Sequence, residues 1–426
     1  MLLRRLPMLR MTRRAGRGRF MSSGRPRTFQ IGQGGRLVID AGNAQAVVKV
    51  TTQWIDSCNV AIFQMPASAR GGWELDETRN NGSGLVSGED VEGLTLGADD
   101  ALGEVTVAHD GDREGGDSEK AYLIEAVVPE LFSVDVKAWR GSVSVSRKMK
   151  GDCLVQLDEG NINIGTIRGE TIRLSTGSGR VEVDELEGNV DISATSDVRA
   201  RLINGAKVKI DAAGDNGPSV TVGAMYSSGA QITSAGNVKV TSCHGRIAVD
   251  TAGSSGSVNL GSVNGTAQVS TGEGGAAVHM DVLEEGTGSH IRSDGGDVSI
   301  SLSPQADADV NITGRKIELP SSFEGDNQSG KAAGRINSAA VEPSRAARFG
   351  SPRSSSKEAG GGKIDLVGAR GQSLRQYFPS DAATNDVRPG LTVAAREGAV
   401  VVEILSWADN IARKFMAREA AAESNS

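Results

Sequence analysis

Short runs of alternating apolar and polar residues return about every nineteen residues between positions 141 and 314. Each unit opens with a G-x-V-x-V pattern, and a second alternating pair follows it. Alternation with a period of two, bounded by Gly and Ser, Thr or Asp, predicts short strands that bury one face. Nine such units fill this part of the chain, so repetition is its dominant feature.

Two apolar pairs in each unit are expected to point inward. The first pairs are Val143/Val145, Ile162/Ile164, Val181/Val183, Val198/Ala200, Val220/Val222, Val238/Val240, Val258/Leu260, Val278/Met280 and Val298/Ile300. The second pairs are Val155/Leu157, Ile172/Leu174, Val190/Ile192, Val208/Ile210, Ala230/Ile232, Ile247/Val249, Ala267/Val269, Ser289/Ile291 and Val310/Ile312. Between the strands an apolar residue, a variable residue and Gly form a corner, as in Ile167-Arg168-Gly169. Small hydrogen-bonding residues after the second strand, such as Ser175 and Asp250, are expected to fix the next corner.

One such unit cannot close a core, but stacked units can, because the buried face of each strand then meets those of its neighbours. The sequence therefore predicts an all-β fold, a parallel β-solenoid of about nine coils of about nineteen residues each. Only one aromatic residue, Tyr226, lies in this region, as expected for a thin interior filled by Val, Ile, Leu and Ala.

The flanks differ from the repeat. Residues 31–140 carry longer and less regular strand patterns, which predict an irregular N-terminal β section before a solenoid domain at 141–320. Residues 321–363 are rich in Ser, Gly, Ala and Arg without an apolar pattern, which indicates a disordered linker. Residues 364–426 are expected to form a C-terminal cap.

In that cap, Leu391–Val393 and Ala399–Leu405 are expected to pair as a hairpin. A short amphipathic helix is expected to follow, with Trp407, Ile411 and Phe415 on one face. The cap would cover the open sheet edge at which a solenoid ends.

Charge is divided unequally along the chain. The whole sequence has 46 Lys and Arg against 53 Asp and Glu, but residues 1–30 hold nine Arg and no acid. Leu2, Leu6 and Leu9 recur there at helical spacing, which is the Arg-rich pattern of a mitochondrial presequence. The sequence predicts cleavage between about residues 20 and 30 and a location in the mitochondrial matrix.

The alternative for this segment is a basic arm that binds nucleic acid or an acidic partner. The remainder of the chain is acidic and would repel phosphate, so the presequence is favoured and nucleic acid is not an expected partner. The longest apolar runs span about four residues, too few for a transmembrane helix.

The repeat "GNINIGTIRGETIRLSTGSGRVEVDELEGNVDIS" and the preceding "VVPELFSVDVKAWRGSVSV" resemble the putative-adhesin β-repeat family, a bacterial domain of unknown function. The segment "AQITSAGNVKVTSCHGRIAVDTAGSSGSVNLGSVNGTAQVSTGEGG" resembles its uncharacterised eukaryotic branch, whose members end in a tail like "EGAVVVEILSW". The resemblance covers roughly residues 125–320 and implies a β-solenoid. It implies no catalytic or binding residues.

Few residues are candidates for a catalytic or metal-binding role. Cys243 and His244 are adjacent, but Cys243 occupies the inward corner position held elsewhere by Ile167, so it is expected to pack as a small hydrophobe. His244 is expected at the exposed corner, and His279 and His290 are expected to point to solvent. A zinc site needs three or four converging ligands, so we expect no metal and no other cofactor. Three distant cysteines exclude a disulfide scaffold.

A carbohydrate-active β-helix enzyme would need paired carboxylates in a groove and, usually, aromatic platforms for sugar rings. The acids of the repeat are scattered among turns and exposed positions, and the glycines of 177–180 and 272–277 belong to repeat corners. No nucleotide-binding motif occurs. We therefore expect that the chain is not an enzyme.

The sequence favours a non-catalytic interaction or scaffold protein in mitochondria, because outward residues of a solenoid can vary without touching its core. A basic interaction strip is expected at Lys207, Lys209, Lys239 and Arg246. Protein partners are expected, and self-association through solenoid edges is left open. The alternatives are an adhesin-like surface module and the carbohydrate-active enzyme.

Overall fold

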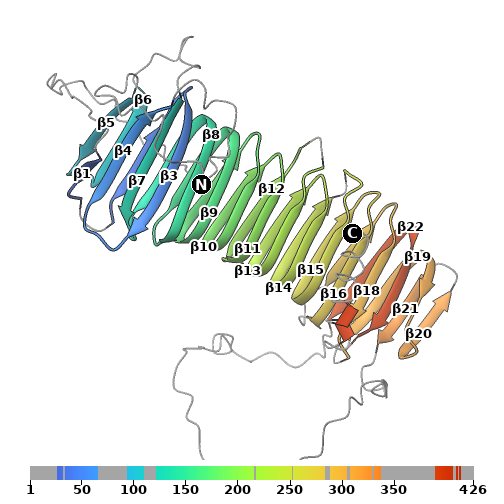
Figure 1. The fold of residues 1–426 in the computed structure, drawn as a ribbon. Helices are drawn as coiled ribbons and strands as arrows, with labels where there is room; N and C mark the ends of the chain where they lie inside the picture. Colours follow the sequence, from blue (N-terminus) through green and yellow to red (C-terminus); the bar gives the residue numbers. More distant parts are fainter. Residues whose placement is uncertain are drawn as a thin grey trace, which may run out of the picture. The chain divides into compact units, whose positions relative to one another are not determined.

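The computed structural model describes residues 26–31, 34–65, 94–109, 121–214, 217–251, 253–283, 288–304, 308–328, 331–336, 389–405, 409–410 and 412–413. These residues are almost entirely strand (Figure 1), so the all-β prediction is confirmed. They divide into two compact units, Met1–Asn237 (unit 1) and Val238–Ser426 (unit 2).

Each unit consists of many strands with few other elements among the described residues. The strands of unit 1 are β1 (Arg27–Phe29), β2 (Arg36–Asp40), β3 (Gln45–Gln53), β4 (Cys58–Gln64), β5 (Leu94–Asp99), β6 (Glu104–His109), β7 (Ala121–Pro129), β8 (Ser133–Met149), β9 (Cys153–Thr176), β10 (Val181–Ala194), β11 (Val198–Asn204), β12 (Lys207–Ala212) and β13 (Val220–Ser234). The strands of unit 2 are β14 (Val238–Thr251), β15 (Val258–Thr271), β16 (Ala276–Leu283), β17 (Ser289–Ser293), β18 (Val298–Leu302), β19 (Ala308–Glu318), β20 (Phe323–Gln328), β21 (Lys331–Ile336) and β22 (Gly390–Ile404).

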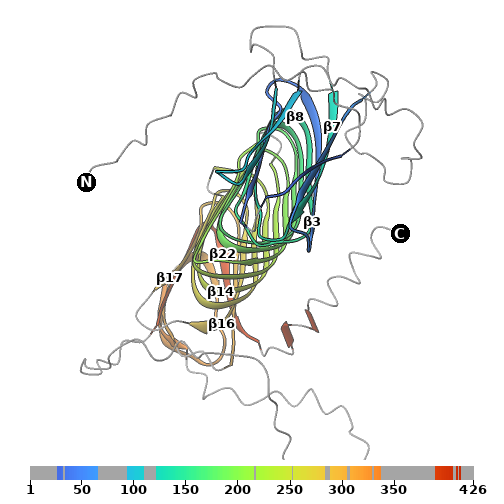
Figure 2. The same ribbon diagram turned by 90° about the vertical axis from the view of Figure 1, so that its left-hand side faces the viewer.

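The coils stack in parallel, with equivalent repeat positions side by side. In unit 1, β10 pairs with β9 so that Val181 lies beside Ile162, and with β11 so that Val181 also lies beside Val198. In unit 2, β14 and β15 pair so that Val238 lies beside Val258. Figure 2 shows successive coils of unit 1 overlying one another. Parallel strands in this register support the predicted β-solenoid.

The core of each coil lies between its two arms, the strand segments before and after the glycine corner. Every residue of the predicted inward pairs is at most 7% exposed. Their side chains therefore form continuous aliphatic columns inside the stack. Larger buried side chains occur where the coils begin, at Tyr122 and Phe132.

The region 31–140 is more regular than the sequence predicts. Strands β2 and β3 pair in parallel with β6 and β7 on one side and with β8 on the other. Strands β2 and β3 therefore form one coil (a rung) of the solenoid. This rung lies between strands that come later in the sequence. The irregular part is confined to antiparallel strands: β4 pairs with β7, β5 with β6 and β1 with β4. Such strands cover the end of the stack, where an open edge would otherwise remain.

The predicted C-terminal hairpin is wrong. Strand β22 is continuous and pairs in parallel with β17 and β18 on one side and with β19 on the other. Gly398, at the place where the hairpin turn was expected, is a solenoid corner instead: a Cβ there would lie 2.2 Å from the carbonyl oxygen of Gly296. Two strand segments joined by such a corner form a rung. A rung and a hairpin have the same local sequence pattern, two alternating apolar runs separated by a glycine.

The predicted disordered linker begins too early. Within 321–363, β20 and β21 form an antiparallel pair, and β21 also pairs with β19. Alternating small residues such as Ala332 supply buried positions that the composition did not reveal. Residues 337–363 lie outside the described residues, as do Trp407, Ile411 and Phe415 of the predicted helix. Asp409, Asn410, Ala412 and Arg413 have helical conformation.

Stacked glycines and buried hydroxyl groups stabilise the turns between strand segments. Gly141, Gly160 and Gly179 stack with positive φ, so each approaches the backbone of the preceding coil. The hydroxyl groups that fix the next corner lie one residue later than predicted and point inward: Thr176 donates to the carbonyl of Gly160 (2.7 Å), and Ser234 to that of Pro218 (2.8 Å). Buried hydroxyls need such partners, and the corner carbonyls provide them.

Replacing a stacked corner glycine should be severe. Gly160 has φ 134°, and its added Cβ would lie 1.7 Å from the carbonyl oxygen of Gly141. Gly160→Ala should lower the free energy of unfolding by about 3 kcal/mol or more, since both strain and a backbone clash result. Gly97→Ala is the control, because no atom lies within 4 Å of its added Cβ. Urea denaturation of the two variants should separate them, and equal midpoints would contradict this account of the corner.

Candidate functional site

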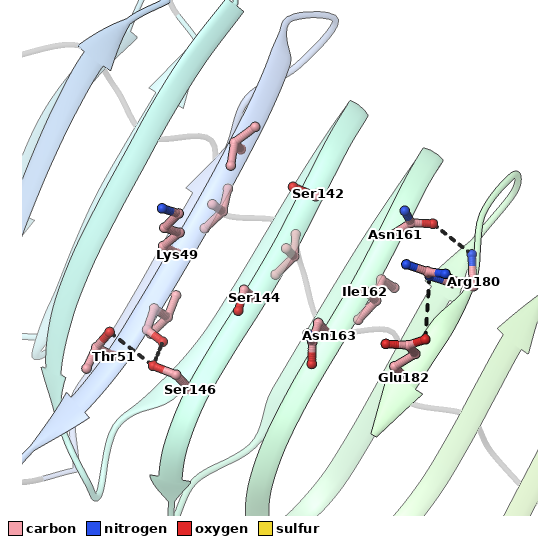
Figure 3. A pocket seen from close by; sticks show the side chains of 14 residues that line it. Lys49, Thr51, Ser142, Ser144, Ser146, Asn161, Ile162, Asn163, Arg180 and Glu182 are labelled. Carbon is pink, nitrogen blue, oxygen red and sulfur yellow. Dashed lines mark hydrogen bonds and ion pairs between the residues drawn. The ribbon is translucent and has the colours of Figure 1, made fainter. Parts of the chain in front are cut away.

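A shallow polar furrow follows the outer side of the first arms in unit 1 (Figure 3). One depression of about 390 Å³ lies over β3, β8, β9 and β10, and a second of about 410 Å³ lies over β9, β10, β11 and β13. Both are lined by Asn163 and Glu182, so they form one surface, called the furrow below. Its other polar side chains are Lys49, Thr51, Ser142, Ser144, Ser146, Asn161, Arg180, Asp184, Arg199, Arg201 and Thr221.

The furrow follows directly from strand alternation. Its side chains occupy the outward positions between the inward pairs, as Ser144 does between Val143 and Val145. Register then aligns them from coil to coil: Lys49 lies beside Ser144, and Asn163 beside Ser144 and Glu182. Neutral hydroxyl and amide groups therefore line the part over β8 and β9, and charged groups line the part over β10 and β11.

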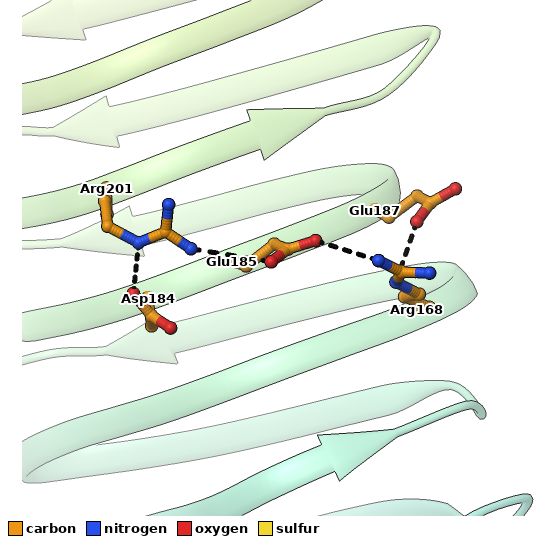
Figure 4. Close-up of polar contacts among 5 residues, drawn as sticks. All are labelled: Arg168, Asp184, Glu185, Glu187 and Arg201. Atoms are coloured by element: carbon orange, nitrogen blue, oxygen red, sulfur yellow. Dashed lines mark hydrogen bonds and ion pairs between the residues drawn. The ribbon is translucent and has the colours of Figure 1, made fainter. Parts of the chain in front are cut away.

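The charged groups of this part are paired with one another (Figure 4). Arg201 donates to Asp184 and lies 3.5 Å from Glu185, which in turn accepts from Arg168 at 3.2 Å. The hydrogen bond from Arg201 to Asp184 raises the pKa of Arg201 above its usual value. Glu182 is close to both Arg180 (3.5 Å) and Arg199 (4.0 Å). Exposed pairs of this kind contribute little stability, but they partly offset the charge of the arginines that line the furrow.

An exposed aromatic side chain follows the end of β3, one of the strands under the furrow. Trp54 follows Thr51 by three residues and is 83% exposed. The Lys150 ammonium lies 5.2 Å from the Trp54 ring centroid, and Lys150 also pairs with Glu130 at 3.2 Å. Tryptophans held in this way are frequent anchors of protein interfaces.

The four residues of the predicted basic strip lie on different parts of the structure. Lys207 and Lys209 share the outer side of β12 in unit 1, and Lys209 lies beside Asp191, which pairs with Arg173. Lys239 and Arg246 belong to unit 2, on the two arms of β14. The structure therefore brings Lys207 and Lys209 together, whereas Lys239 and Arg246 are separated by the Cys243–Gly245 corner.

The cysteines are core residues, as predicted for Cys243. It is 1% exposed and lies beside Val263 in the paired corner position. Cys58 and Cys153 are fully buried. Burial raises the pKa of all three thiols to about 12, so the reactive thiolate is scarce at neutral pH. His244 is half-buried at the corner, beside Asn264.

The prediction for His279 is wrong. Its ring is 3% exposed and lies between Ser301, 2.7 Å from Nδ1, and Asp281, 3.0 Å from Nε2. Because an ionised carboxylate only accepts, Nε2–H donates to Asp281, and Nδ1 shares a hydrogen bond with the Ser301 hydroxyl. Ser262 also donates to Asp281. His290 is exposed, as predicted.

The C-terminal segment contacts strands on both sides of β16. Ser301 is in register with both His279 and Glu403, which binds Arg413 at 2.7 Å. Asn410 is 8% exposed and donates to the carbonyl oxygen of Gly261 at 3.2 Å. His279 is thus an outward residue of β16 that tertiary contacts have covered.

Hydroxyl, imidazole and carboxylate in a row are also the groups of a hydrolase triad. Here the imidazole is closed off from solvent and the hydroxyl lies on a paired strand, which favours a structural role. The sequence carried one signal, a His two residues before an Asp, but that spacing is common. Among the residues the structure describes, no group of three or more His, Cys, Asp or Glu side chains could hold a metal ion. Nor does any described helix have the length and apolar character that crossing a bilayer requires.

No family model matches the chain, and no curated protein matches it. Two solved structures are similar. The crystal structure of a putative adhesin from Bacteroides fragilis NCTC 9343 has 13% sequence identity and a TM-score of 0.28, covering 65% of this chain and 95% of that chain. The crystal structure of a putative cell adhesion protein from Clostridium sporogenes ATCC 15579 has 8% identity and a TM-score of 0.17, covering 89% of this chain and 100% of that chain. TM-scores this low do not support an inference about function. The function is therefore inferred from the residues of the chain itself.

Removal of the buried imidazole should be costly. His279→Ala leaves Asp281 and Ser301 without their shared partner, and the free energy of unfolding should fall by about 1–3 kcal/mol. The matched control is His290→Ala on the neighbouring strand, where an exposed side chain should change stability by no more than about 0.5 kcal/mol. Chemical denaturation of both variants provides the measurement. A neutral effect at His279 would show that the cluster is not structural.

Proposed function

We propose that this chain is a non-catalytic interaction protein whose furrow on unit 1 binds an extended, polar segment of a partner protein. The observation that carries the proposal is the furrow itself, two adjoining depressions of about 390 and 410 Å³ over neighbouring coils. Register repeats the same outward positions from coil to coil, so the surface has the length that an extended ligand needs.

The lining supports a polypeptide ligand. Side chains such as Ser144 and Asn163 donate and accept hydrogen bonds, as the amides of an extended peptide require. Arg180 and Arg201 are paired with Glu182 and Asp184, so part of the charge along the furrow is offset within it. No aromatic residue is among those lining the two depressions, which disfavours sugar rings. Trp54, just after β3, offers an exposed apolar anchor.

The lining also supports a role without catalysis. Neither His nor Cys is among the residues that line the depressions. The cysteine thiols are buried with pKa values near 12, and the one hydroxyl–imidazole–carboxylate cluster described above is covered. These are features of a binding surface on a rigid scaffold.

Filling the furrow should abolish peptide binding. A library of displayed peptides would be panned against the full chain and against a Ser144→Arg/Asn163→Arg double variant, whose side chains occupy the lined space without touching the core. We expect enriched peptides to bind the unaltered chain and to lose at least tenfold in affinity for the double variant, measured by calorimetry.

Two controls make this test decisive. Gln231→Arg adds an exposed Arg on the second arm of β13 and should leave the affinity unchanged. Charge reversal at Lys207, Lys209, Lys239 and Arg246 tests the predicted basic strip on the same peptides. Loss of binding only on charge reversal would move the site to that strip. Absence of any enriched peptide would overturn the proposal.

We further propose that the protein acts in the mitochondrial matrix, since the nine Arg and no acids of residues 1–30 match a presequence. Strand β1 contains Arg27–Phe29 and pairs with β4, so cleavage before Arg27 would preserve that pair. The adhesin-like alternative requires the protein outside the cell, so location separates the two.

The leader predicts a specific processing pattern. The full chain and a version lacking residues 1–24 would each carry a C-terminal tag and be followed by fractionation with protease protection. We expect the full chain to be protected inside mitochondria with its new N-terminus between about residues 20 and 26, and the shortened chain to stay in the cytosol. An untrimmed, secreted full chain would instead support the adhesin-like alternative.

A further inference from the structure

Strand β22 fills a slot inside unit 2, between strands that precede it in the sequence. It pairs in parallel with β17 and β18 on one side, where Ile291 lies beside Val393 and Ile300 beside Val402. On the other side it pairs in parallel with β19, where Ile312 also lies beside Val393. Both main-chain edges of β22 are therefore used, and β19 joins the earlier coils through it.

The slot recognises the sequence of β22 closely. Its inward residues Leu391, Val393, Val400 and Val402 are each at most 2% exposed, so the slot requires apolar side chains at these positions. The corner requires glycine, because a Cβ on Gly398 would meet the backbone of the preceding coil. A strand that fits this slot needs the spacing of apolar residues and glycine that β22 has, and the β22 of a second copy supplies it.

Polar contacts reinforce this register at the corner. The amide of Ala399 donates to Asp297 at 2.7 Å, and the amide of Leu405 donates to the carbonyl of Leu302 at 2.9 Å. A one-residue slip would break these contacts and turn every inward side chain outward. A strand that entered in another register would thus lose both its buried side chains and these hydrogen bonds.

The connection to β22 is the longest between consecutive strands of unit 2, running from β21 through residues 337–389. The advantage of a tethered strand over one from another molecule falls with the length of its tether. Exchange of an identical element between copies forms the same contacts in both arrangements, so it costs little. Strand β22 and its slot thus have the properties expected of an element that is exchanged between two copies of a chain.

We propose that the slot between β17/β18 and β19 accepts β22 from a second copy of this chain, so that two chains associate by exchanging their C-terminal strands. The interaction is independent of the furrow, which lies in unit 1. It differs from edge-to-edge stacking because the donated strand enters between existing coils.

Engineered cysteines at paired positions test the exchange in the intact protein. Ser299 is exposed and lies beside Val401 in the parallel pair of β18 and β22, so their Cα atoms are close enough for a disulfide. One chain would carry Ser299→Cys, a second, differently tagged chain would carry Val401→Cys, and the two would be produced in the same cells. The native cysteines are buried with pKa values near 12 and should not compete.

We expect a covalent dimer of the two tagged chains after mild oxidation, visible on a non-reducing gel. Replacing Val401→Cys by Thr392→Cys is the matched control: Thr392 is also outward on β22 but lies beside His290, so this mixture should give at least fivefold less dimer. Adding Gly398→Val to the Val401→Cys chain should abolish the dimer, because the strand then no longer fits the corner.

A chain carrying both Ser299→Cys and Val401→Cys makes a negative result interpretable. If this chain closes its disulfide internally while the mixture gives no dimer, β22 is supplied only by its own chain and the exchange is refuted. If neither disulfide forms, β22 does not occupy the slot in solution, which overturns the proposal at its first step.

Discussion

Parallel, in-register pairing of successive coils is the constraint on which the rest of the structure depends. It places each residue directly over its repeat equivalent, so equivalent inward positions are mostly apolar from coil to coil, as in the column Ile162, Val181 and Val198. It also brings the corners into backbone contact, where Gly160 admits no Cβ. Thin coils leave room for aliphatic side chains and small hydroxyls, whereas large side chains such as Tyr122 and Phe132 are buried where the coils begin.

The same constraint frees the outer surface. Outward residues stack in columns without affecting the core, so a furrow of Ser, Asn and paired Arg and Glu can form at no cost to the fold. The ion pairs around Glu185 are exposed and contribute little stability. Their effect is to offset part of the charge along the surface.

Parallel stacking does not require chain order, and both units depart from it. Strands β2 and β3 lie between β6/β7 and β8, and β22 lies between β17/β18 and β19. In both places antiparallel strands follow on the outermost coil: β4 and β5 in unit 1, β21 in unit 2. Covered ends limit edge-to-edge association.

The sequence by itself determined the strands, the inward residues and the corner glycines of 141–314, because period-two alternation and backbone geometry are local properties. It also placed Cys243 in the core by its repeat position. Only the tertiary structure decided that 391–404 is a rung rather than a hairpin, since the partners of a strand lie far away in the sequence. It likewise decided that His279, outward on its strand, is buried, because Ser301 of a distant strand and Asp281 enclose its ring. Local pattern specifies which side of a strand faces the core, whereas distant contacts specify what covers the other side.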